Sequence, residues 1–296
     1  MRKPLALDLF CGAGGVAQGL ISAGFDVVGV DINPQPNYPG IFYQLDVSRL
    51  RVVDGYIFLD ATCLGGTASP LPLIDSFAFV WASPPCQFAT ALGRARSNVR
   101  NDHQNMIPQT RELLEAIGLP YVIENVSMAR GELRDPVTLC GSHFYGPQYL
   151  GCKFLTPSGI SSRRSMTHCK RRDLGRFERH RCFETSGFDL VAPAQCDHKL
   201  WPKGCPASKN REPYSRRTVA IGQYGAATCV DEEGNIIGEQ EPMPLEYQRA
   251  VMGVQPRPIK DRKGELAELS QMVPPIYAEY IGKALLDQMK KNGGLF

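Results

Sequence analysis

One cysteine stands in an unusual setting, within FVWASPPCQFAT at residues 79–90. An apolar run that predicts a buried strand ends there at two prolines, and Cys86 follows them directly. The prolines remove backbone donors and fix the turn, which would hold the thiol in one orientation. Core packing stays open as a role for this residue alone, but the setting favours a nucleophile.

An acid and two arginines could act with this thiol. Glu124 lies in a predicted strand, YVIENV at 121–126, and would stand at the end of the neighbouring strand. A thiol and a carboxyl group are useful together around a heteroaromatic ring, because one can attack the ring while the other handles a ring proton. Arg179 and Arg181 flank His180 in RHR, and on a strand they would point to one side, suited to a base carbonyl or a phosphate. A plain ion pair of Glu124 is the structural alternative.

A glycine-rich turn, DLFCGAGG at 8–15, follows an apolar run and precedes a helical pattern. Glycines let the backbone approach a ligand closely, and the start of a helix presents unpaired N–H groups. The spacing departs from the G-x-G-x-x-G dinucleotide pattern, and Asp8 would repel a pyrophosphate. An acid there suits a ligand with an amino group, such as the methionine part of S-adenosylmethionine.

Two more acids stand at predicted strand ends. Asp31 ends a strand at 26–32 and could accept hydrogen bonds from two ribose hydroxyls, and Asp46 near the end of 42–47 could accept one from an adenine amino group. An acid at the end of a strand is common for structural reasons, so each of these acids alone indicates little. Together with the glycine turn, at successive strand ends, they favour an adenosyl cofactor.

The elements that must position these residues alternate between strand and helix. Strands are predicted at 5–10, 26–32, 42–47, 77–82 and 121–126, and helices at 16–25, 108–118 and 276–291. This alternation predicts an α/β fold with a doubly wound, mostly parallel sheet. Residues 55–75 break the rhythm and are interpreted as an insertion that could hold a small hairpin.

The composition indicates an intracellular globular protein. The chain has 296 residues, 43% of them hydrophobic, which suits one large domain and a smaller one. No window approaches the ~18 apolar residues of a membrane span, and glycines and an acid arrive too early for a signal peptide. The ten cysteines are spread singly, so reduced thiols with catalytic or metal roles are favoured.

Basic residues are unevenly distributed, although the net charge is only +3. They cluster at 163–181 and 208–217, which suggests a polyanionic partner or else a solvated surface. Periodicity fades from about Gly187 and returns in the C-terminal helix. We therefore predict a catalytic domain formed by 1–186 plus 270–296, and a small irregular or β-rich domain at 187–269.

Several metal-ligand residue types fall in or near the second region: Cys169, Cys182, Cys196, His198 and Cys205. Structural zinc could staple a thin domain. The spacing lacks paired C-x-x-C motifs, however, so packing or surface thiols are favoured and no metal is predicted.

Taken in order, the motifs resemble those of the DNA (cytosine-5) methyltransferase family, in the compact form common in phages and prophages. DLFCGAGG resembles the cofactor motif, SPPCQ the nucleophile motif, ENV the glutamate motif, and RHR the arginine motif that precedes the target-recognition region. EYQRAVMG (246–253) resembles a late motif, and VPPIYAEYIGKAL (273–285) the C-terminal helix. Phe177 and Gln271 depart from the family, which usually has Gln and Asn there.

This resemblance implies a Rossmann-like S-adenosylmethionine-dependent fold with a target-recognition domain. It implies methyl transfer to carbon 5 of a cytosine flipped out of duplex DNA, through a covalent adduct with Cys86. Glu124 would engage the exocyclic amine and N3, while Arg179 and Arg181 would hold the carbonyl and an adjacent phosphate. The arginine-bearing loop at 88–105 would close over the DNA.

The resemblance also implies a cofactor site and partners. The residues expected to contact S-adenosylmethionine are Asp8, Phe10, Gly12, Ala13, Gly14, Gly15, Asp31, Ile32, Asp46, Val47, Pro85, Gln271 and Val273. We expect a cytoplasmic monomer that binds double-stranded DNA and no membrane, with a role in restriction-modification or phage DNA protection. Methylation of RNA, as in the tRNA-directed branch, and a catalytically silent DNA-binding module stay open as alternatives.

Overall fold

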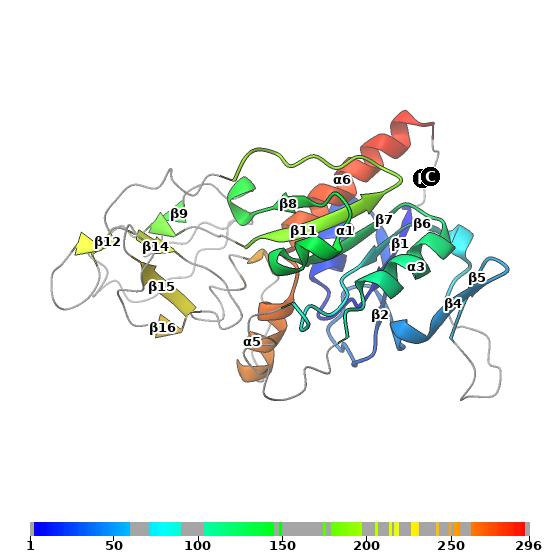
Figure 1. Cartoon of the computed structure of the whole chain (residues 1–296), viewed down its shortest axis with the longest axis horizontal. Coiled ribbons are helices and arrows are strands. Elements are labelled where there is room, and N and C mark those ends of the chain that lie inside the picture. Colours follow the sequence, from blue (N-terminus) through cyan, green and yellow to red (C-terminus); the bar gives the residue numbers. More distant parts are fainter. Residues whose placement is uncertain are drawn as a thin grey trace. The chain divides into compact units, whose positions relative to one another are not determined.

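The computed structural model describes two compact units of the chain (Figure 1). The described residues are 3–59, 71–89, 104–144, 148–149, 174–175, 179–196, 205–206, 213–214, 216–218, 226–230, 241–242, 249, 252–254 and 262–293. The first unit comprises Met1–Thr138, Arg181–Val191 and Met272–Phe296, and the second comprises Leu139–His180 and Ala192–Gln271. The sequence predicts a catalytic domain, 1–186 plus 270–296, and a recognition domain, 187–269. These domains divide the chain by expected function, and that division stays a prediction.

A seven-stranded sheet forms the centre of the first unit, in the order β3-β2-β1-β6-β7-β11-β8 (Figure 1). The strands are β1 (Leu5–Leu9), β2 (Asp26–Asp31), β3 (Ile41–Gln44), β6 (Phe77–Ala82), β7 (Tyr121–Val126), β8 (Val137–Leu139) and β11 (Arg181–Ser186). The first five pair in parallel, and β11 runs antiparallel to β7. The predicted mostly parallel α/β sheet is therefore confirmed.

Three helices cover this sheet: α1 (Gly15–Ala23), α3 (Ile107–Ile117) and α6 (Pro275–Lys291). Pro108 stands in the first turn of α3, where its missing N–H costs nothing, and Gly118 ends the helix at a left-handed φ of 75°. The helix α1 packs against α6 at glycines, since a Cβ on Gly19 would lie 2.1 Å from the carbonyl oxygen of Pro275. The predicted helices are confirmed within a residue or two.

The sheet is buried on both faces because side chains alternate along each strand. Leu7 and Leu9 of β1 belong to the core cluster that includes α3 residues such as Leu114. The opposite face carries a chain of ring contacts that links Phe25, Phe79, Trp81, Phe183 and Tyr277, with centroids 5.6 to 6.5 Å apart. Asp8, between two leucines of β1, points to this aromatic side.

A hairpin stands at the start of the expected insertion, 55–75, but its first strand precedes that range, and residues 60–70 lie outside the described residues. β4 (Leu50–Val53) and β5 (Tyr56–Leu59) pair antiparallel around Asp54 and Gly55, whose φ values are 48° and 78°. Two positive φ angles in an Asp-Gly pair are the type I′ turn of tight hairpins. The third strand also ends early, because Val47–Arg49 forms a 3₁₀ turn, η1, that Asp46 caps.

The described part of the second unit is made of short elements. They are η5 (Gly141–His143), β9 (Gln148–Tyr149), β10 (Leu174–Gly175), β12 (Cys205–Pro206), β13 (Pro213–Tyr214), β14 (Arg216–Thr218), β15 (Ala226–Val230), β16 (Glu241–Pro242) and α5 (Arg262–Gln271). The β character agrees with expectation, but α5 was not predicted. None of the helices in the described ranges has both the length and the apolarity to cross a bilayer.

Candidate active site

The predicted site residues meet where the strand order of the sheet reverses. From β1 the chain proceeds outward to β2 and β3, then returns to place β6 on the other side of β1. The carboxyl ends of β1 and β6 flank this switch point, which is where open α/β sheets bind ligands. The glycine turn follows β1 and the Pro-Pro-Cys turn follows β6, and the Ser83 N–H donates to the Leu9 carbonyl at 3.1 Å.

The glycine turn is held in a fixed shape. Phe10 has a positive φ of 57°, which is costly for a bulky residue and is a sign of a constrained site. The Gly12 N–H donates to Asp31 Oδ2 at 3.0 Å, and a Cβ on Gly14 would lie 2.4 Å from Pro39. A Cβ on Gly12 would meet no atom within 4 Å, so this part of the backbone borders open space.

Asp8 is a fully buried acid beside this turn. Its Oδ2 accepts a hydrogen bond from the Tyr38 hydroxyl at 2.9 Å, whereas its Oδ1 is buried and has no hydrogen-bond partner among the described residues. Burial raises the pKa of Asp8 to about 8, against the lowering effect of the Tyr38 hydrogen bond. A buried carboxyl oxygen without a partner is costly, and a cationic ligand would relieve that cost.

Asp31 stands at the end of β2 as predicted, whereas Asp46 follows the end of β3 by two residues, and each acid is already engaged. Asp31, the last residue of β2, accepts from the Gly12 and Asn33 N–H groups. The Asp46 Oδ1 accepts from the N–H and the hydroxyl of Ser48, which caps η1. Each carboxylate oxygen has more than one acceptor site, so both acids keep capacity for a ligand.

A cavity of about 400 Å³ lies beside these elements. Its lining includes Phe10, Val47, Leu50, Met106, Thr110 and Leu113, from the glycine turn, the η1 region and α3. Phe10 and Val47 were both predicted to contact a cofactor. Ile32, predicted with them, is 59% exposed and does not line the cavity.

Cys86 is half-buried on a turn that a neighbouring strand holds in place. The Asn125 side chain of β7 donates from Nδ2 to the carbonyl oxygen of Pro84 at 2.9 Å, and its Oδ1 accepts from the Val126 N–H. The Cys86 carbonyl accepts from the Ala89 N–H at 3.0 Å, which closes the turn on its other side. Pro85 is exposed next to the thiol.

Glu124 and Arg181 form a buried ion pair. Arg181 Nε lies 2.8 Å from Glu124 Oε1, and their side chains are only 12% and 7% exposed. The antiparallel pairing of β7 with β11 creates this contact, since Val126 is opposite Arg181 and Glu124 is opposite Phe183. Glu124 therefore stands beside the Cys86 turn at the same edge of the sheet, with the Arg181 guanidinium against its carboxyl group.

The predicted site is only partly assembled in the first unit. Val273 belongs there, and its carbonyl oxygen would lie 2.2 Å from a Cβ on Gly15. Arg179 and Gln271 belong to the second unit. The prediction that both arginines of RHR lie on one strand is wrong, because β11 begins at Arg181. Arg94, Arg96 and Arg100 of the predicted closing loop lie outside the described residues.

Two residues that contribute to the site were not predicted. Tyr38 bonds Asp8, and its ring occupies the space beside Gly29 where a Cβ would lie 2.5 Å from the hydroxyl. Asn125 tethers the Cys86 turn. An Asn inside a strand is disfavoured by β propensity, and this could have indicated a special role for Asn125. Tyr38 follows a proline-rich loop, where no sequence signal indicates its contact with Asp8.

Comparison with known proteins supplies the fold. No family model matches the chain, and no curated protein matches its sequence. Among solved structures, it is similar to a prophage-encoded E. coli protein assigned as a DNA modification methyltransferase, with 17% identity, a TM-score of 0.51, and coverage of 97% of this chain and 100% of that one. A Spodoptera frugiperda DNMT2 mutant has 13% identity, a TM-score of 0.50, and coverage of 96% and 99%. The likeness establishes the fold.

Proposed function

We propose that this chain transfers a methyl group from S-adenosylmethionine to carbon 5 of cytosine in duplex DNA. The observation that carries the proposal is the buried Glu124–Arg181 pair beside a Pro-Pro-Cys turn that Asn125 anchors at the switch point. A positioned thiol and a carboxyl group next to it suit attack on a pyrimidine ring. The fold shared with a protein assigned as a DNA modification methyltransferase supports the same reading.

The glycine-turn region fits an adenosyl cofactor with an amino group. Asp8 offers a buried, unpartnered oxygen for a cationic amine, and Gly12 leaves room for close approach. Asp31 would hold ribose hydroxyls, and the apolar walls of the cavity at Phe10 and Val47 suit an adenine ring. When bound, S-adenosylmethionine supplies an electrophilic methyl group.

The residues of the chain prepare the acceptor. The Cys86 thiolate adds to carbon 6 of the flipped-out cytosine, and the ring electrons move toward N3, which takes a proton from the protonated form of Glu124. Carbon 5 then becomes nucleophilic enough to take the methyl group. Loss of the carbon-5 proton to water, return of the N3 proton to Glu124 and cleavage of the bond between Cys86 and carbon 6 restore the aromatic ring, the acid and the thiolate. Arg181 keeps Glu124 oriented throughout.

Trapping on fluorinated DNA tests this proposal. DNA of mixed sequence, amplified with 5-fluorodeoxycytidine triphosphate, offers every target site at once and cannot lose the carbon-5 fluorine as a proton. With S-adenosylmethionine, the wild-type chain is expected to form a covalent complex stable in denaturing gels. Cys86→Ser should abolish it, whereas Cys182→Ser should retain it, because Cys182 is a buried residue of β11 that contacts Thr138.

The outcomes separate the alternatives. No complex with the wild-type chain, or an undiminished complex with Cys86→Ser, would overturn the mechanism. Trapping on 5-fluorocytidine-containing tRNA but not on DNA would assign the chain to RNA. Binding of DNA without any trapping is the result expected of a silent DNA-binding module.

A further inference from the structure

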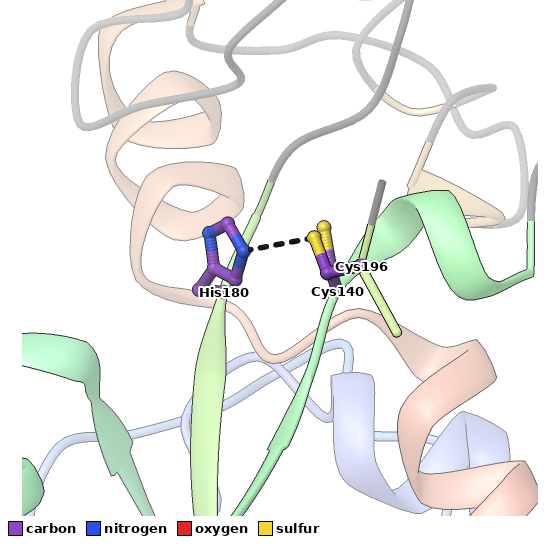
Figure 2. A group of neighbouring side chains, drawn as sticks. All are labelled: Cys140, His180 and Cys196. Atoms are coloured by element: carbon purple, nitrogen blue, oxygen red, sulfur yellow. Dashed lines mark hydrogen bonds between the residues drawn. The ribbon is translucent and has the colours of Figure 1, made fainter. Parts of the chain in front are cut away.

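The second unit brings together three metal-ligand side chains from distant points in the sequence (Figure 2). Cys140 follows β8, His180 precedes β11, and Cys196 lies in the segment that begins at Ala192. Their ligand atoms all lie within 4.8 Å of one another, and His180 Nε2 is 3.2 Å from Cys196 Sγ. Figure 2 shows the imidazole and both thiols pointing toward one another.

These separations match those of a tetrahedral zinc site. Zn–S bonds of about 2.3 Å and Zn–N bonds of about 2.0 Å place neighbouring ligand atoms roughly 3.5–3.8 Å apart. The observed spacing brackets that range, so small rotations of side chains suffice to admit the ion. Two thiolates and an imidazole are soft and borderline ligands, which favour zinc over magnesium or calcium.

The surroundings of the three residues resemble a prepared site. The Ser142 hydroxyl donates to Cys140 Sγ at 3.2 Å and lies 3.5 Å from Cys196 Sγ, so it contacts both sulfur atoms. The Cys140 N–H donates to His143 Nδ1, which fixes the turn that follows. Cys140 is fully buried while His180 and Cys196 are partly accessible, which leaves an entry path for an ion.

The location gives the site a structural purpose. The chain passes between the two units at four places, and each ligand stands close to one of three of them: after Thr138, before Arg181 and after Val191. The described strands of the second unit are short, and five of them contain only two residues. A small unit with little regular structure gains most from a metal staple.

We propose that Cys140, His180 and Cys196 bind one Zn²⁺, which joins three of the four segment ends of the second unit. Three ligands among the described residues leave one tetrahedral position for water or a further ligand. His180 lies between Arg179 and Arg181, so the ion also restrains the arginine pair. Of the cysteines considered from sequence, Cys196 is a ligand, whereas Cys182 is turned to Thr138 and Arg130. The proposal does not depend on methyl transfer.

Metal analysis of the purified full-length chain tests the site. The wild-type chain should carry about one zinc per molecule, and after removal of zinc, Co²⁺ should give the intense thiolate-to-cobalt absorption of a tetrahedral site. Cys196→Ser and His180→Gln are expected to lower zinc retention at least tenfold under a competing chelator. Cys182→Ser is the matched control and should retain zinc as the wild type does.

The measurement decides without relying on the folding of any variant. A wild-type chain that neither contains zinc nor gives the cobalt spectrum overturns the proposal. So does full zinc retention in both Cys196→Ser and His180→Gln, which would place the metal elsewhere. The protein can also be purified anaerobically without added reductant and examined by mass spectrometry. A Cys140–Cys196 disulfide in that sample would overturn the zinc site and assign the two thiols to oxidation instead.

Discussion

At the scale of single residues, Asp8 carries a cost to folding and, under the proposed function, would contact the cofactor. Its carboxyl group is fully buried, with one oxygen bonded to Tyr38 and the other without a partner among the described residues. Its pKa is raised to about 8 in the folded chain, mainly by burial, compared with about 3.9 in an unfolded one. Between these two values the folded chain holds one more proton than the unfolded chain, so this group lowers stability as pH rises.

Asp8→Asn is therefore expected to stabilise the ligand-free protein in mildly alkaline solution. The Asn oxygen can still accept from Tyr38, and the cost of a buried charge disappears. Denaturant unfolding should show the variant equal to the wild type near pH 4 and more stable by about 1 kcal/mol or more at pH 8. A difference that shrinks as pH rises would contradict this assignment of the proton.

The same substitution should weaken cofactor binding, because the variant lacks the negative charge that would face the amine. Loss of one partner of a buried charge pair costs about 2 kcal/mol or more, which is roughly 30-fold in Kd. Isothermal titration with S-adenosylhomocysteine measures this at pH 8. If the variant is more stable than the wild type but binds S-adenosylhomocysteine with the same Kd, Asp8 does not contact the cofactor.

At the scale of elements, strand β7 and helix α6 do most of the positioning. β7 carries Glu124, which pairs with Arg181, and Asn125, which holds the Cys86 turn. The segment that leads into α6 lies against the glycine turn, since the Val273 carbonyl fills the space where a Cβ of Gly15 would be. The glycines of α1 therefore serve helix packing as well as any ligand.

Gly19→Ala tests the packing role apart from the site. A Cβ there would lie 2.1 Å from the Pro275 carbonyl oxygen and 2.8 Å from Ala278 Cβ, so α6 must shift. Overpacking of this kind costs about 1–3 kcal/mol, against the small gain in helix propensity that Ala brings. Gly131→Ala is the control, because its Cβ meets no atom within 4 Å and its φ is not left-handed. Equal unfolding free energies for the two variants would refute the close α1–α6 contact.

At the scale of the whole molecule, sequence reasoning succeeded where the chain obeys periodic rules. Apolar runs predicted the five parallel strands, and a parallel sheet brings its carboxyl ends together, so Asp31, Cys86 and Glu124 could be expected at one edge. The rules for connections between parallel strands leave few other arrangements of these five strands. Helix ends were legible from Pro108 and Gly118.

What could not be predicted depends on contacts between segments that no local pattern connects. The antiparallel return of β11 decides that Arg181 reaches Glu124, and its starting point leaves Arg179 outside the strand. Cys140 and His180 come together through the same return, although they lie far apart in sequence and match no ligand spacing. Buried partners of this kind arise from tertiary structure alone.

The return of β11 is stabilised by a second buried ion pair, on the other face of the sheet. Arg111 of α3 donates from Nε and Nη2 to the two carboxylate oxygens of Glu184, both at 2.7 Å, and also to the Glu132 carbonyl. The Arg134 N–H donates to Glu184 as well. Burial alone would raise the pKa of Glu184, but these donors outweigh it and the pKa is lowered.

Arg111→Ala should cost about 3–5 kcal/mol of unfolding free energy, because it leaves the buried Glu184 carboxylate without its guanidinium partner. Glu115→Ala breaks the ion pair with Arg134, which is exposed: 47% of the Glu115 side chain and 64% of the Arg134 side chain are accessible. This variant should cost less than about 1 kcal/mol. The pH dependence gives the sharper test. In the wild type the Glu184 contribution is present above the unfolded pKa and is lost as pH falls through the lowered folded pKa.

In Arg111→Ala burial dominates and the pKa of Glu184 rises above its unfolded value, so the sign of that contribution reverses. Stability of the variant should then increase, relative to wild type, as pH falls from 7 to 5. Urea unfolding of both proteins across that interval measures the difference. If the difference in unfolding free energy between the two proteins stays constant over this interval, Arg111 contributes packing rather than charge. The ion pair would then not be among the forces that hold β11, and with it Arg181, in place.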